Sequence, residues 1–464
     1  MNNTKRGLFA SYVDGIRDKS GQSWHSIAAI FWPEFVTALV LFVLPQLIDV
    51  RLVAELTSTT MTATVGLSTR LLHFFMKVAE GLAVGIIVIC GQANGAGNRH
   101  RLGVTINDAL WVSVFFGLIF GITLYLTAPF IYSCMATSDA MATMGVAFVR
   151  LRAVGVFCTF VFFGAAACMR GLKDTKTPML IYLIGALVYI LADYGLIFGY
   201  WGLPALGLQG SAWAGVIQYA IMASLSLLLL YTGRYREQLN LRLRWPTGLS
   251  AAIAVIQLSW PVIIDKATIV FAYLWLLKTL QPMGETVVAS FCTVNDLEKI
   301  AYLPATACAH VVTVLASNEF GAGNWEGIKS CIKKVFFMAA IGVCAILLLL
   351  CIDPVYVVHQ FDLKGDFTAF AATVFPIISL LVFFDVLQMI LAGALRGVSD
   401  ARSVMITRLL VCFGYFVPVS YIASKLPIES CLVKSILIYA LFYVGHALMS
   451  AIYIYRFRTD QWRH

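Results

Sequence analysis

The stretch MRGLKDTKTPM at residues 169–179 returns in altered form as LRGVSDARSVM at residues 395–405. The offset in numbering between their arginines, Arg170 and Arg396, is 226 (396 − 170). The segments GQANGAGN, ending at Asn98, and SNEFGAGN, ending at Asn324, have the same offset (324 − 98). Two motifs that share one offset indicate an internal duplication. We therefore predict that the chain folds as two related halves.

The composition indicates that these halves lie in a membrane. Of the 464 residues, 60% are hydrophobic and only 12% are charged, which excludes ordinary soluble domains. A transmembrane helix requires about 20 mainly apolar residues, and about twelve such runs alternate with short polar segments. The runs cover residues 27–54, 61–91, 107–133, 142–168, 178–200, 208–232, 250–277, 286–317, 330–353, 368–395, 403–424 and 432–455. We predict an all-α membrane protein with twelve transmembrane helices in two pseudo-symmetric six-helix bundles.

Basic residues predict the domain boundaries and the orientation. The amino-terminal lobe is expected at residues 1–231 and the carboxy-terminal lobe at 250–464, joined by the basic cytoplasmic linker 232–249. Because Lys and Arg are retained on the cytoplasmic side, an arrangement with both termini inside fits the sequence. The opposite loops then hold few basic residues: Arg51, Lys278, Lys364, Lys425 and Lys434. The net charge of +9 thus reflects topology and does not indicate nucleic-acid binding.

Signatures of other functions are missing from the sequence. The polar segment before Trp24 does not have the pattern of a removable signal peptide. The eleven cysteines are scattered without a CxxC pair, so we expect buried thiols rather than disulfides or a metal framework. No HExxH, Walker or nucleophile-elbow pattern occurs. We therefore predict neither an enzyme nor a bound cofactor, and we assign no metal site.

Acidic residues inside the apolar runs are the candidate coupling sites, because a buried carboxylate is costly unless it is paired or lines a cavity. Burial and nearby charges control whether such a group holds a proton. The candidates are Asp49, Asp193, Asp385, Asp265 and Glu34. For the last two, a coupling role and a fixed salt bridge are both open, with Lys266 beside Asp265 and Lys77 level with Glu34 as the expected partners.

Further ionisable residues form a predicted supporting network. In the first half, helical spacings of three and four residues place several of them on one face, which we expect to point into the lobe. In the second half, others fall near the middle of the seventh and eighth runs. The predicted network comprises Arg70, His73, Lys77, Lys266, Asp296, Glu298 and Lys299.

The motifs resemble those of the multidrug and toxic compound extrusion (MATE) transporters, within the wider multidrug, oligosaccharidyl-lipid and polysaccharide flippase superfamily. MRGLKDTKTPM is similar to the family's Arg-Gly and Asp-Thr segment, and GQANGAGN to its GAG turn. The segments LIDVRLVAEL around Asp49, LADYGLIFGYWG around Asp193 and DVLQMILAGALRG around Asp385 are similar to further family segments. The resemblance implies a V-shaped pair of lobes.

The resemblance also implies a function, namely secondary active antiport that exports cationic or amphipathic drugs by alternating access of the lobes. It implies a monomer in a bacterial inner membrane, with small organic molecules and membrane lipids as its partners. Departures from the family pattern concern the coupling ion. Tyr189 replaces a usual asparagine and Gly215 a usual threonine, which removes oxygen ligands that sodium prefers. We therefore favour protons, with sodium as the alternative.

A flippase for lipid-linked oligosaccharides or cell-wall precursors is the alternative function. Such cargo carries a polyanionic head group and needs a cationic cavity. Arg70, Arg150 and Arg152 keep this alternative open, whereas the acidic candidates favour export of cations.

Overall fold

The computed structural model describes residues 22–54, 59–134, 138–239, 241–242, 244–246, 249–362 and 365–463, and the elements in these ranges are helices. The first half contains α2 (Trp24–Ala54), α3 (Thr59–Gly95), α4 (Arg99–Cys134), α5 (Asp139–Gly171), α6 (Lys176–Phe198), α7 (Leu208–Thr232) and α8 (Arg234–Leu239). The second half contains α9 (Leu249–Leu280), α10 (Glu285–Ala301), α11 (Leu303–Gly321), α12 (Trp325–Ile352), α13 (Pro354–His359), α14 (Thr368–Ser379), α15 (Val382–Gly397), α16 (Ala401–Val411), α17 (Val417–Lys425) and α18 (Cys431–Arg458).

The helices agree with the predicted number of membrane crossings. In the described part of the chain, ten helical stretches are long and apolar enough to cross a membrane, and two bent helix pairs raise this number to twelve. The bent pairs are α10 with α11, at 50°, and α14 with α15, at 51°. A π-helical turn at Cys412–Phe416 joins α16 to α17. The prediction of an all-α membrane protein is confirmed.

The chain forms two compact units. We call Trp32–Ile263 the N lobe, and we call the residues up to Phe31 together with Ile264–His464 the C lobe. Both junctions fall inside long helices, α2 and α9, rather than in the basic segment 232–249. That segment is attached to the N lobe, because the side chains of Asn107 and Trp111 on α4 donate hydrogen bonds to the Arg244 carbonyl at 2.9 and 2.8 Å.

The duplicated GAGN turns have the same backbone geometry. Gly97 and Gly323 adopt φ values of 72° and 69°, which is the left-handed conformation that glycine tolerates best. The next residue in each copy caps the following helix. The Asn98 side chain accepts a hydrogen bond from the Arg101 amide at 3.0 Å, and the Asn324 side chain accepts one from the Gly327 amide at 3.0 Å. The sequence repeat is therefore a structural repeat.

The turns after α5 and α15 repeat equally closely. Lys173 and Ser399, which are related by the same offset as the arginines, have φ values of 64° and 67°. The amide of Asp174 donates to the Met169 carbonyl at 3.1 Å, and the amide of Asp400 donates to the Leu395 carbonyl at 2.9 Å. Asp174 also accepts hydrogen bonds from the Lys176 and Thr177 amides at the start of α6, at 3.1 Å each, and so caps this helix.

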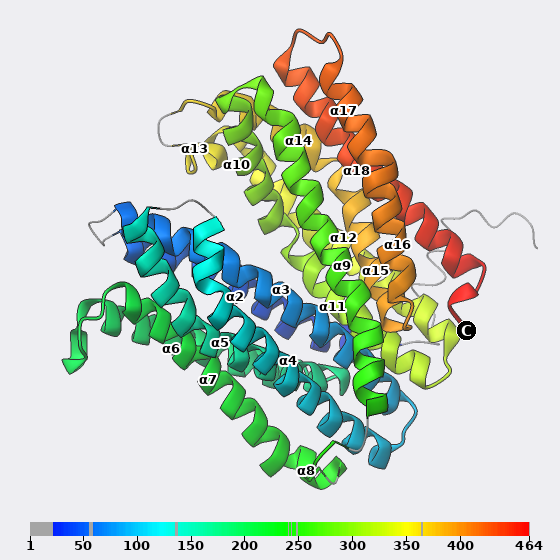
Figure 1. The fold of residues 1–464 in the computed structure, drawn as a ribbon. Coiled ribbons are helices and arrows are strands. Elements are labelled where there is room, and N and C mark those ends of the chain that lie inside the picture. Colours follow the sequence, from blue (N-terminus) through cyan, green and yellow to red (C-terminus); the bar gives the residue numbers. More distant parts are fainter. Residues whose placement is uncertain are drawn as a thin grey trace, which may run out of the picture. The chain divides into compact units, whose positions relative to one another are not determined.

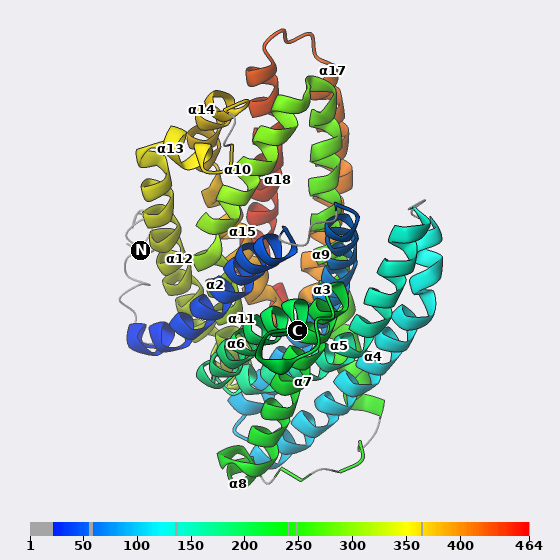
Figure 2. The ribbon, with the colours of Figure 1, turned by 90° about the vertical axis from the view of Figure 1, so that its left-hand side faces the viewer.

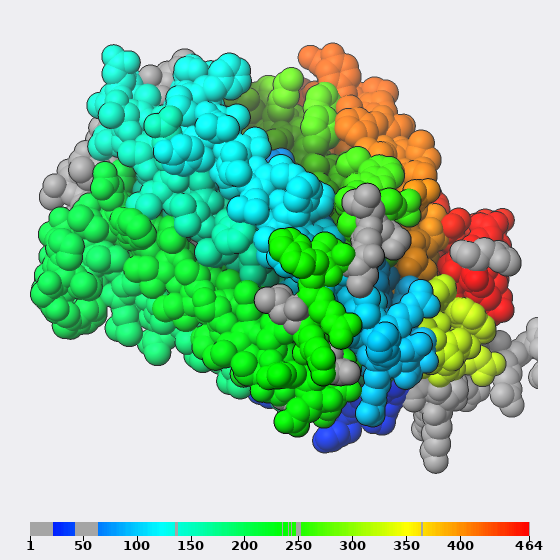
Figure 3. Space-filling view, turned by 60° about the horizontal axis from the view of Figure 1, so that its bottom comes forward, coloured from blue at the N-terminus to red at the C-terminus, as the bar shows by residue number. Residues whose placement is uncertain are grey.

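Small residues allow close packing inside each lobe. In the N lobe, α5 packs against α3, α4 and α7, and α6 packs against α7 (Figure 1). Figure 3 shows one face of this lobe, where the cyan and green side chains of α4 to α8 lie side by side. In the C lobe, α11 and α15 pack against each other and against α12, and α18 packs against α15 (Figure 2). A Cβ added at Gly171 would lie 2.6 Å from the Cys90 Cβ, and one added at its repeat Gly397 would lie 2.8 Å from the Ala316 Cβ. Ala316 is the counterpart of Cys90 at the same offset.

We predict that Gly397→Ala destabilises the protein by about 1–3 kcal/mol through overpacking. An added Cβ would lie 2.8 Å from the Ala316 Cβ and 2.8 Å from the Thr313 carbonyl oxygen. Thermal unfolding of the purified protein measures the effect. Gly414→Ala is the matched control, because nothing lies within 4 Å of its Cβ position. Equal melting temperatures for the two variants would contradict the packing argument.

Candidate coupling site in the C lobe

An Asp–Arg cluster joins three helices of the C lobe. Asp265 on α9 is fully buried, and its two carboxylate oxygens accept hydrogen bonds from Arg396 on α15 and Arg408 on α16. The predicted pairing with Lys266 is wrong, because successive residues of a helix point about 100° apart. Two guanidinium groups therefore more than balance the charge of Asp265, which identifies it as an anchor between helices.

A polar chain continues from Arg408 to a second acid. With its amide oriented to satisfy both neighbours, Gln388 accepts a hydrogen bond from Arg408 Nη2 at 2.6 Å and donates one to Asp385 Oδ1 at 3.2 Å. Asp385 lies in the first turn of α15, directly after the bend between α14 and α15. The His446 Nε2 atom on α18 is 3.8 Å from Asp385 Oδ1. These polar contacts connect Asp265 through Arg408 and Gln388 to Asp385, which in turn lies next to His446.

Glu298 forms a separate cluster with tyrosines. This residue of α10 is 1% exposed, and its carboxylate accepts hydrogen bonds from Tyr439 at 2.9 Å and Tyr443 at 2.6 Å. The Tyr443 hydroxyl is also 3.0 Å from the hydroxyl of Tyr302, which lies at the bend between α10 and α11. Neutral hydroxyls, rather than guanidinium groups, therefore hold the Glu298 carboxylate.

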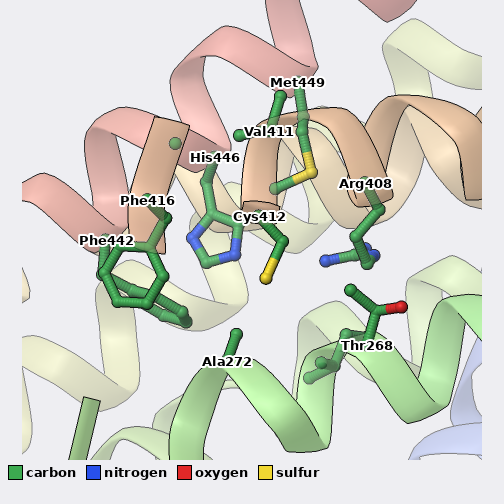
Figure 4. A pocket seen from close by; sticks show the side chains of 11 residues that line it. Thr268, Ala272, Arg408, Val411, Cys412, Phe416, Phe442, His446 and Met449 are labelled. Atoms are coloured by element: carbon green, nitrogen blue, oxygen red, sulfur yellow. The ribbon is translucent and has the colours of Figure 1, made fainter. Parts of the chain in front are cut away.

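A small cavity lies beside these clusters. It has a volume of about 30 Å³, enough for a water molecule or two. Figure 4 shows the side chains of Arg408, Cys412 and His446 extending into the same space, with Thr268 and Ala272 of α9 opposite them. Cys412 begins the π-helical turn of the α16–α17 junction. Such turns widen a helix locally and are frequent at functional sites.

In the N lobe, Glu34 pairs with a different residue from the one predicted. Its carboxylate accepts a hydrogen bond from Arg170 Nε at 2.7 Å, and both side chains are buried. Lys77 instead contacts Glu80 at 3.0 Å and is 55% exposed. The predicted Glu34–Lys77 pair is therefore wrong, because the repeated Arg-Gly turn at the end of α5 supplies the cation.

The polar stripe of α3 does not point into the lobe, contrary to the prediction. Arg70, His73 and Lys77 are exposed, while Leu72 and Ala79 on the other side of the helix are buried. The apolar face of α3 takes the packing contacts, which leaves the charges on the opposite face. In the second half, Asp296 and Lys299 likewise form an exposed pair at 2.7 Å, so they do not join the buried network.

The remaining N-lobe candidates have distinct environments. Asp193 on α6 is fully buried. Asp49 lies in α2, but its side chain is outside the described part of the structure. Gly215 on α7 lies beneath Arg152, so that a Cβ at this position would be 1.1 Å from Arg152 Nη1. A guanidinium group thus occupies the space that a side chain at position 215 would fill.

Comparison with known families agrees with the duplicated fold. The profile of the MatE family matches residues 35–194 and 261–422, and the starts of the two matches have the offset of the sequence repeat (261 − 35). The chain belongs to the MatE family. Its two halves are thus two copies of the family's unit, and the resemblance noted in the sequence is confirmed.

Curated relatives of this MatE protein span most of its length. It is 24% identical over 415 residues to a probable multidrug resistance protein NorM of Synechocystis sp., covering 85% of this chain and 86% of that protein. It is 26% identical over 336 residues to the multidrug resistance protein PmpM of Pseudomonas aeruginosa, covering 71% of this chain and 69% of that protein.

Solved structures share the MatE fold. One is the outward-facing conformation of a multidrug resistance MATE family transporter, with a TM-score of 0.85, 16% identity and coverage of 99% of this chain and 98% of that chain. Another is a transporter of the same superfamily from Pyrococcus furiosus, described as having a binding pocket of reverse polarity. It matches with a TM-score of 0.84, 15% identity and coverage of 99% and 98%.

Several members of the C-lobe network were missed in the sequence. Arg408 and His446 lie within the predicted runs 403–424 and 432–455, where any ionisable residue is a candidate. Arg396 belongs to the repeated Arg-Gly turn, and only the fold shows that its side chain reaches Asp265. Gln388, Tyr439 and Tyr443 carry no charge, and only the fold brings them beside Asp385 and Glu298.

We predict that Asp265→Asn destabilises this MatE protein by about 3–5 kcal/mol, because Arg396 and Arg408 lose their shared counter-charge in a buried position. The measurement is the temperature at which the purified protein loses its monodisperse peak in size-exclusion chromatography. Asp296→Asn is the control, since its carboxylate is 41% exposed and such pairs contribute about 0–1 kcal/mol. An Asp265 variant as stable as the control would exclude the anchor role.

Proposed function

We propose that the protein exports cationic or amphipathic organic compounds in exchange for protons. The relatives named multidrug resistance proteins support small organic molecules as its cargo. The C-lobe arrangement of Glu298 and Asp385 is the observation that carries the proton-coupled mechanism. These two acids are buried beside neutral hydroxyls, an amide and an imidazole, whereas Asp265 is held by two guanidinium groups.

The charge balance assigns different roles to these acids. The Glu298 carboxylate has only neutral donors, and Gln388 separates the Asp385 carboxylate from Arg408, so neither acid is in direct contact with a guanidinium group. A proton or a cationic substrate therefore stabilises these acids inside an apolar lobe. Asp265 already has that compensation and does not need either. Glu298 and Asp385 are therefore the residues at which a proton and a cation compete, and alternating access converts this competition into antiport.

His446 provides a route for the proton. Its Nε2 faces Asp385 at 3.8 Å, and its Nδ1 is buried without a hydrogen-bond partner among the described residues. An imidazole can accept a proton at one ring nitrogen and release one from the other. The ring also lines the small cavity, so it links Asp385 to a space that can hold water.

The N-lobe geometry supports protons over sodium. Sodium, as a hard cation, prefers several oxygen ligands. Gly215 supplies no side-chain oxygen, and the Arg152 guanidinium occupies the adjoining space with a positive charge. Within the described residues, no group of three or more His, Cys, Asp or Glu side chains could hold a metal ion. Asp193 and Asp49 remain proposed N-lobe coupling residues on the basis of the family resemblance.

Export of an anionic lipid-linked precursor is a second candidate function. The related transporter from Pyrococcus furiosus is described as having a pocket of reverse polarity that suggests a different function. Arg152 provides a cationic group within the N lobe of this chain, in line with such cargo. The acids of the C lobe favour cationic cargo.

For either cargo, we propose that the protein is a monomer in a bacterial plasma membrane, with both termini in the cytoplasm.

We expect Glu298→Gln and Asp385→Asn to abolish substrate-evoked proton release, because an amide has the shape of the acid but does not titrate. The measurement uses proteoliposomes with a pH-sensitive dye inside and a lipophilic organic cation as the substrate. The exposed Asp296→Asn variant should release protons as the wild type does.

Replacement of potassium by sodium in the same assay tests the coupling ion and should leave the proton signal unchanged. Wild-type release by both acid variants would exclude the proposed C-lobe site. Movement of a fluorescent polyprenyl-phosphate lipid without any proton signal would instead favour the flippase.

A further inference from the structure

Arg152 is a half-buried arginine in the middle part of a membrane-spanning helix, α5. It lies about 20 Å from one end of α5 and about 28 Å from the other, given 1.5 Å of rise per residue. Its guanidinium group rests on the backbone of α7 at Gly215, with Nη1 1.1 Å from the position that a Cβ would take. The absence of a side chain at position 215 is therefore what allows Arg152 to adopt this position.

The guanidinium group has unused hydrogen-bonding capacity. Among the described residues, no hydrogen-bond acceptor or carboxylate is paired with Arg152. The nearby hydroxyls are used elsewhere, since Thr159 donates to the Gly155 carbonyl at 2.8 Å and Tyr219 points to the Met76 sulfur at 3.9 Å. An arginine offers five N–H donors in a planar fork. Because Arg152 is only half-buried, these donors are accessible to a ligand.

A small cavity adjoins the guanidinium group. It has a volume of about 20 Å³, and apart from Arg152 and the two hydroxyl residues it is lined mainly by apolar groups, including Leu72, Phe75 and Val156. This space admits a small head group rather than a whole amphipathic molecule. A planar carboxylate matches the guanidinium fork in two parallel hydrogen bonds, and the apolar lining would contact the adjoining hydrocarbon.

The neighbouring arginine on α5 is in a different situation. Arg150 lies over the ring of Tyr125, with its guanidinium carbon 5.2 Å from the ring centre, and its Nε is buried without a hydrogen-bond partner among the described residues. Two residues along a helix correspond to a rotation of about 200°, so Arg150 and Arg152 leave α5 on nearly opposite sides. Arg150 is thus a matched control in the same helix.

We propose that Arg152 forms a subsite in the N lobe for the carboxylate group of a zwitterionic or acidic amphipathic cargo. This inference rests on the proposed export function for the identity of its ligand. It adds a carboxylate to the chemical groups of the cargo that the protein binds. Gly215 is the residue that creates the subsite, because any larger side chain would displace the guanidinium group.

The test compares binding of two probes that differ only in charge at one group, a rhodamine with a free carboxylate and its methyl ester. Fluorescence anisotropy with the full-length protein in lipid nanodiscs gives both dissociation constants. We expect the wild type to bind the acid about tenfold more tightly than the ester, as a charge-assisted pair of about 1.4 kcal/mol would give. Arg152→Gln and Gly215→Val should reduce this ratio to about one.

Arg152→Lys should retain an intermediate ratio, because lysine keeps the charge but lacks the planar fork. Arg150→Gln should keep the ratio of the wild type. Thermal unfolding of each variant establishes that it is folded. An Arg152→Gln protein that is folded and still prefers the acid would overturn the proposal, as would a wild type without any preference. The assay needs no transport, so failure of proton coupling in the proteoliposome assay would be a separate result.

Discussion

The cost of an unbalanced charge in an apolar lobe is the constraint on which the arrangement of the C lobe depends. Asp265 satisfies it with Arg396 and Arg408, and this cluster holds α9, α15 and α16 together. Because one of these arginines also contacts Gln388, the anchor is continuous with the site of Asp385. The cluster around Asp265 thus holds Asp385 in position, and in the proposed mechanism Asp385 exchanges a proton for a cation.

The two lobes have the same plan but different chemistry. Their loop geometry repeats to within a few degrees of φ at Gly97 and Gly323. Their interiors diverge, since the N lobe contains Arg152 over Gly215, whereas the C lobe contains Glu298 among tyrosine hydroxyls. Duplication therefore preserved the backbone that positions the helices, while the side chains facing the interior changed. In the proposed mechanism, such divergence allows one lobe to exchange protons and the other to recognise a different part of the cargo.

Periodicity and repeats were sufficient to predict the helices and the duplication. These features depend on local patterns and on composition, which a sequence displays directly. The pairing of charges was harder to predict. Glu34 and Lys77 were matched by depth alone, but helix rotation turns Lys77 outward and brings Arg170 to the acid. Long side chains such as Arg396 also reach inward from a turn. The tyrosines around Glu298 are neutral and give no signal until the fold brings α10 and α18 together.

The arginine of the repeated Arg-Gly turn contacts an acid on the first helix of its own half, Glu34 in one case and Asp265 in the other. The acids do not occupy equivalent positions, since the offset of the repeat carries Glu34 to Trp260. A chimera that replaced the start of one half by that of the other would therefore place the new acid out of reach and leave a guanidinium without its counter-charge. Recombination libraries built from this protein should keep the first and fourth helices of each half together as one inherited block.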